Sequence, residues 1–128
     1  MNERELLTEI VRIARHADGL TPALRQIQTL IAKEYGGALL MIRPPAPGAA
    51  LASPAVHDFL EAKDFPFRGL YTAPLTTRRR DTATLVACIG TWGAPGEILR
   101  RIVTFAGEQL TELARRLSLH TLDYAEAR

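Results

Sequence analysis

The chain has 128 residues, of which 47% are hydrophobic and 23% charged, and its formal net charge is +2. This length provides one core and one domain over residues 1–128, and this composition excludes an intrinsically disordered chain. The small net charge and the lack of an apolar run of about 18 residues argue against a nucleic-acid-binding protein and a membrane-spanning protein.

Two amphipathic helices are predicted at the start of the chain. Apolar residues recur at steps of three and four over residues 3–17, which predicts the first helix. Thr21 and Pro22 predict the start of a second helix. The threonine hydroxyl can accept a hydrogen bond from an unpaired backbone amide, and proline is tolerated at the first helical position because the amide hydrogen that it lacks would have no partner within the helix. Gly36 or Gly37 ends this helix.

Three strands are predicted after the helices. Residues 38–43 form an apolar run that is too short for a helix, which indicates a strand buried on both faces. Residues 67–76 and 82–90 are rich in strand-forming residues, and the polar turn at 78–81 joins them into an antiparallel hairpin. Pro74 has no amide donor, so we expect its strand to lie at an edge of the sheet.

Two further helices are predicted. Ser53 and Pro54 are typical of a helix start, so a short helix is expected over residues 54–63. After the glycine-rich turn at 91–96, a helical apolar pattern begins at Ile98 and continues through Tyr124. The order of elements predicts an α+β fold, in which helices cover an antiparallel sheet.

The last helix has a second apolar stripe, formed by Ile98, Ile102 and Phe105. One stripe can pack on the sheet while the other remains for a partner, so the first and last helices together are expected to form a four-helix dimer interface. The alternative is that the first and last helices cover each other within one subunit.

The order of elements, the run at 82–90, its exit turn and the helix that opens at Pro95 and continues through residues 105–110 resemble the GAF domain family. The similarity covers roughly residues 6–117. It implies a cup-shaped, PAS-like antiparallel sheet with the N- and C-terminal helices on one face and a short helix and loop over the other. It also implies a small-molecule pocket and a helical dimerisation surface.

Within this resemblance, residues 1–19 and 118–128 are interpreted as helical dimerisation or linker segments. The compact region at 44–67 argues against a large ligand such as a cyclic nucleotide or a bilin. The expected ligand-binding residues are the hydrogen-bonding or polarisable side chains on the elements around the pocket. They are Arg43, His57, Tyr71, Cys88 and Trp92.

Cys88 is the single cysteine, which excludes an internal disulfide and a zinc site built from cysteines. Ile89 follows it, unlike the Cys-His pair of bilin-attaching relatives, and a sulfoxide reductase of this type would need a second, resolving cysteine. We therefore interpret Cys88 as a core residue. His16, His57 and His120 fall on different elements without metal-ligand spacing, so no metal site is expected.

The function expected from these features is a noncatalytic sensory or regulatory domain in signal transduction. It would bind an unidentified small molecule, form a homodimer and act on a linked or separate effector, and no cofactor is identified. The alternatives are a structural or protein-interaction module whose pocket is filled by side chains and, third, a thiol-dependent reductase.

Arg78, Arg79 and Arg80 are interpreted as a solvated turn rather than a nucleic-acid site. The single cysteine and the lack of a secretion signal favour the cytoplasm.

Overall fold

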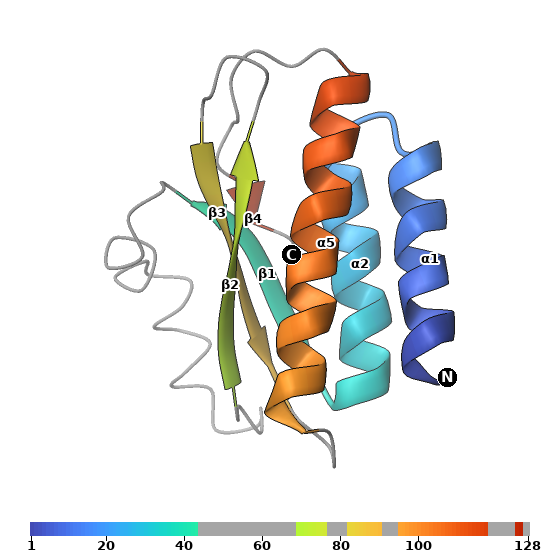
Figure 1. Ribbon diagram of the computed structural model, residues 1–128, viewed down its shortest axis with the longest axis vertical. Coiled ribbons are helices and arrows are strands. Elements are labelled where there is room, and N and C mark those ends of the chain that lie inside the picture. Colours follow the sequence, from blue (N-terminus) through green and yellow to red (C-terminus); the bar gives the residue numbers. More distant parts are fainter. Residues whose placement is uncertain (44–68, 77–81, 91–94, 118–124, 127–128) are drawn as a thin grey trace.

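The computed structural model describes residues 1–43, 69–76, 82–90, 95–117 and 125–126 (Figure 1). The elements are α1 (Glu3–His16), α2 (Leu20–Tyr35), β1 (Ala38–Arg43), β2 (Gly69–Thr76), β3 (Thr82–Ile89), α5 (Gly96–Arg116) and β4 (Ala125–Glu126). The sheet is antiparallel in the order β2-β3-β1-β4, with three main strands and the two-residue β4. The α+β class is therefore confirmed. The helix expected at 54–63 lies outside the described residues.

The described helices form two layers on one face of the sheet (Figure 1). α5 packs on β2 and α2 packs on β1, whereas α1 packs against α5 and α2. The N- and C-terminal helices were expected on one face of the sheet; α5 lies directly on it, whereas α1 lies on the same side in a second layer. Three main strands, spaced about 4.8 Å apart, form a narrow face, and two helices packed about 8–10 Å apart are enough to cover it. No room is left on this face for α1, which packs on the other two helices.

The ends of the first two helices follow local chemistry. Asn2 caps α1, because its side-chain oxygen accepts a 2.8 Å hydrogen bond from the Glu5 amide. The predicted capping role of Thr21 is wrong, since α2 begins at Leu20 and the capping position is Gly19. Leu20 packs against the core, and this contact extends the helix beyond the expected start. Gly36 ends α2 in the left-handed conformation at φ 82°, as predicted.

The strand predictions are confirmed for β1, β2 and β3. The central residues of β1, Leu40 and Ile42 on the helix side and Met41 on the other, are all buried. Pro74 lies in the edge strand β2 and is exposed, where its missing amide donor leaves no ladder position unpaired. β2 and β3 form the expected antiparallel hairpin.

Of the expected helical extension over residues 118–128, the structure describes only residues 125–126, and these form a strand instead of a helix. The helix α5 ends at Arg116, and Ala125 and Glu126 form β4, paired with Ile42 and Met41 of β1. Beside this pairing, the Leu40 amide donates a 2.8 Å hydrogen bond to Oε1 of Gln28. The edge of β1 therefore gains partners from α2 and from β4, which satisfies backbone groups that a buried edge must pair.

The second apolar stripe of α5 is used within the subunit. Ile102 is fully buried, and Ile98 and Phe105 are partly buried against the same core. α1 packs on α5 beside them. The arrangement in which the first and last helices cover each other within one chain is thus present, and only the partly exposed edge of this stripe remains for a partner.

Candidate functional site

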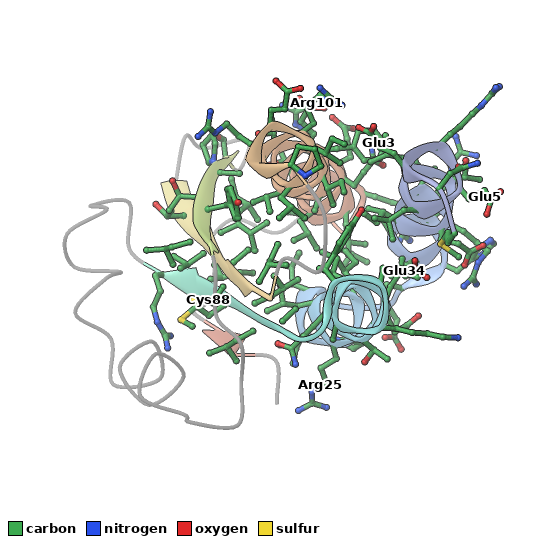
Figure 2. All side chains as sticks on the ribbon, turned by 90° about the horizontal axis from the view of Figure 1, so that it is seen from below. Glu3, Glu5, Arg25, Glu34, Cys88 and Arg101 are labelled. Carbon is green, nitrogen blue, oxygen red and sulfur yellow. The ribbon has the colours of Figure 1, made fainter. Side chains whose placement is uncertain are left out.

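The outer face of the sheet, opposite the helices, has its own apolar cluster. Met41, Val86 and Cys88 are fully buried there, and Leu39 and Leu70 pack against them. The cross-strand register brings these side chains together, because Cys88 pairs with Leu39 on one side and Leu70 on the other. Figure 2 shows the Cys88 side chain on the side of the sheet that faces away from the helices.

One end of this outer face is polar. Arg43 and Thr84 are cross-strand partners, and the alternation of a strand places them on the same face as Met41 and Val86. Thr84 is only 7% exposed and is the one buried polar residue among those described, while Arg43 is half-buried. The face thus has a guanidinium and a hydroxyl at one end of a buried apolar cluster whose border, Leu39 and Leu70, is partly exposed. This arrangement is suited to a molecule with an apolar body and an anionic group.

The chemistry of Cys88 is limited by its surroundings. Burial raises the pKa of its thiol from 9.0 to about 12, so the thiol is protonated at neutral pH. Because the thiolate is the reactive form of cysteine, this position is suited to packing rather than to nucleophilic attack.

Tyr71 does not join Arg43 and Cys88 on the outer face. It pairs with Ala87 and packs on the helix-facing core, whereas its neighbour Leu70 pairs with Cys88. A β-carbon added at Gly69 would lie 2.5 Å from the Tyr71 ring, so this ring covers the glycine of its own strand. Grouping Tyr71 with Arg43 and Cys88 in one pocket is therefore wrong, because neighbouring strand residues point to opposite faces.

The remaining predicted site residues, His57 and Trp92, lie outside the described residues. Among the residues that are described, no group of three or more His, Cys, Asp or Glu side chains is placed to hold a metal ion. No helix in the described ranges combines the length and apolar character needed to cross a membrane.

A groove between α1 and α5 has no counterpart in the sequence-based site. It has a volume of about 530 Å³, and its lining combines two apolar residues with charged and polar ones. The lining residues are Glu3, Leu7, Glu97, Arg100, Arg101, Thr104, Phe105 and Glu108. The two helices are far apart in sequence, so only their packing brings these residues together, and helical periodicity gives no signal for it.

An ion pair closes one part of this groove. Nε and Nη2 of Arg101 donate to the two carboxylate oxygens of Glu3 at 3.0 and 3.1 Å, which links α5 to α1 (Figure 2). The hydrogen bond from Arg101 lowers the pKa of Glu3. Both side chains are solvent-accessible, so the pair orients the helices more than it stabilises the fold.

A second groove, between α1 and α2, has a volume of about 360 Å³ and a mainly basic rim formed by Arg12, Arg25 and Lys33. Arg12 is already paired with Glu9 at 2.8 Å. This groove lies on the other side of α1 from the α1–α5 groove.

Comparison with known proteins finds no matching family model, no matching curated protein and no matching solved structure.

Proposed function

We propose that the chain is a noncatalytic, GAF-like regulatory domain that binds a small molecule on the outer face of its sheet. The observation that supports this most is the Arg43–Thr84 cross-strand pair at one end of the buried Met41–Val86–Cys88 cluster. In the proposed complex, the apolar body of the ligand packs on the partly buried Leu39 and Leu70 at the border of the cluster, and a carboxylate or similar anion meets Arg43 and Thr84. Guanidinium and hydroxyl groups are suited to this role, because both donate hydrogen bonds to anionic oxygens.

The proposal includes a homodimer formed through the terminal helices α1 and α5 and an effector that responds to it. We place the domain in the cytoplasm, where its single cysteine would stay reduced. The raised pKa of Cys88 supports a noncatalytic role over a thiol-dependent reductase, since a protonated thiol is a poor nucleophile.

Thermal shift measurements test the binding proposal. The panel consists of aliphatic and aromatic carboxylates, each compared with its neutral amide. A ligand that binds only the folded state stabilises it by about 2.7 kcal/mol at a concentration of 100 times Kd. We expect saturable stabilisation by at least one carboxylate and weaker stabilisation by its amide.

Two substitutions sharpen this test. Arg43→Gln should abolish the preference for the carboxylate over the amide, because it removes the cation and keeps similar volume. Arg25→Gln, an exposed change on α2, is the matched control and should leave the preference unchanged. Equal loss in both variants would assign the preference to net charge and reject the proposed anion site.

A second candidate is an interaction module whose outer face is filled by the chain's own side chains. It is favoured by the complete burial of Met41, Val86 and Cys88. This candidate predicts no saturable shift with any compound of the panel. It also predicts that Val86→Ala destabilises the fold by about 1–3 kcal/mol without affecting any ligand response.

A further inference from the structure

Two opposite charges flank the middle of the exposed face of α5. Arg100 and Glu108 lie four residues before and four residues after Thr104, so the three side chains share one face of the helix. All three residues are exposed and line the α1–α5 groove. Within the described part of the chain, the side chains of Arg100 and Glu108 form no hydrogen bond or ion pair, whereas the neighbouring Arg101 is paired with Glu3.

Apolar surface lies beside these charges. Leu7 from α1 and Phe105 from α5 are only partly buried, and both line the groove. An apolar centre with a polar rim is the usual composition of an interface between proteins.

We propose that a second copy of this chain docks on the groove in an antiparallel arrangement, with the two-fold axis passing beside Thr104. Such a symmetric interface uses the same patch on both copies. Residues at equal distances on either side of Thr104 then face each other, so Arg100 of each copy meets Glu108 of the other. The two Phe105 side chains and the two Thr104 side chains come together at the centre.

The charge pattern selects this orientation over a parallel one. In a parallel pair of α5 helices, Arg100 would face Arg100 and Glu108 would face Glu108, and like charges across an interface are unfavourable. The antiparallel pair replaces both repulsions with attractions. The side chains of Arg100 and Glu108 have no partner within the described part of a single copy, so no existing ion pair has to break when the dimer forms.

This inference rests on the dimerisation part of the proposed function and specifies the geometry of the dimer. It is independent of ligand binding, because the α1–α5 groove and the outer face of the sheet lie on different sides of the molecule (Figure 2). Failure of the dimer proposal can therefore be distinguished from failure of the ligand-binding proposal.

Sedimentation velocity on the full chain at low salt tests the contacts. Arg100→Glu places Glu opposite Glu108, so the dimer Kd should rise about tenfold. The double variant Arg100→Glu with Glu108→Arg exchanges the two charges and should restore the Kd to within about twofold. Arg25→Glu, the same charge change on α2, is the control and should have no effect, because Arg25 lines the α1–α2 groove and not the α1–α5 groove.

A distance measurement tests the orientation directly. Spin labels are attached to Glu97→Cys, and Cys88 does not interfere because it is fully buried. The antiparallel dimer separates the two labelled positions by about 21 Å along the helix axis, given a rise of about 1.5 Å per residue, whereas a parallel dimer places them side by side. Labels at Thr104→Cys should lie close together.

Each result decides the inference. A dimer that weakens with Arg100→Glu, recovers in the double variant and gives the long Glu97 distance supports it. A dimer that ignores Arg100→Glu, or that brings the Glu97 labels together, overturns the antiparallel geometry and leaves dimerisation standing. A monomer at all concentrations overturns both the antiparallel geometry and the dimer itself. The thermal shift measurement then still tests ligand binding on the outer face of the sheet.

Discussion

Gly107 of α5 lies against Ala73 of β2 so closely that a β-carbon added to the glycine would be 2.9 Å from the Ala73 β-carbon. The Pro74 carbonyl oxygen would be 3.3 Å away. These neighbours are strand backbone and a β-carbon, which cannot move aside as a long side chain can. The missing side chain of Gly107 therefore sets how closely the helix approaches the edge strand.

Gly107→Ala should destabilise the protein despite the better helix propensity of alanine. The gain in propensity is about 1 kcal/mol, and overpacking costs about 1–3 kcal/mol. We expect a net loss of about 1 kcal/mol in urea denaturation. The control is Gly96→Ala, where the nearest atom, the Tyr71 hydroxyl, would be 3.5 Å away. A Gly107→Ala variant as stable as wild type would show that α5 can shift on β2 without cost.

Arg116 should stabilise the end of α1. Its Nη2 donates to the carbonyl oxygen of Ala14 at 3.2 Å and to that of Ala17, and these carbonyls belong to the last turn and C-cap of the helix. A cation that caps unpaired carbonyls in this way contributes about 1 kcal/mol. Arg116→Met should therefore lower the free energy of unfolding by about this amount.

Arg115→Met is the matched control for Arg116. Arg115 forms an exposed pair with Glu112 on its own helix, and such pairs contribute about 0.3–0.5 kcal/mol. Hydrogen exchange at the end of α1 should increase in Arg116→Met and stay unchanged in Arg115→Met. Equal effects of the two variants would mean that Arg116 acts only through net charge.

Local sequence patterns were sufficient for most elements and insufficient for their arrangement. Periodicity identified α1 because its apolar stripe is continuous, yet the stripe indicates only that one side is buried. Whether that side meets the sheet or another helix depends on how many helices the sheet can hold. β4 has no local signal at all, since two residues cannot form a pattern, and its pairing depends on the free edge of β1.

The candidate site shows the same limit. Of the predicted ligand-binding residues, Arg43 and Cys88 lie on the outer face of the sheet, whereas Tyr71 lies on the helix-facing side. In strands with apolar residues on both faces, neighbours such as Leu70 and Tyr71 give no contrast from which to choose the orientation. Cross-strand register settles it, because Leu70 is paired with Cys88. Register depends on contacts between distant segments and is not encoded in either strand alone.

Burial of Cys88 makes a prediction about stability at alkaline pH. The thiol pKa is raised from 9.0 to about 12 because the folded protein excludes water from the sulfur. In the unfolded chain the thiol ionises near its ordinary pKa of 9.0, whereas in the folded protein it stays neutral until the pH approaches 12. The contribution of the neutral thiol is therefore complete below about pH 9 and is lost as pH rises toward 12.

The comparison that isolates this effect is wild type against Cys88→Ala, with free energies of unfolding measured by urea denaturation from pH 7 to 11. At pH 7 the alanine variant should be less stable, because it leaves a small cavity at a fully buried position. Above pH 9 wild type should lose up to about 1.4 kcal/mol more per pH unit than the variant, since it alone releases a thiol proton on unfolding. The difference between the two proteins should therefore shrink and can reverse sign. Parallel curves across this range would mean that the folded protein ionises Cys88 as readily as the unfolded chain, and the packing role assigned to this residue would have to be abandoned.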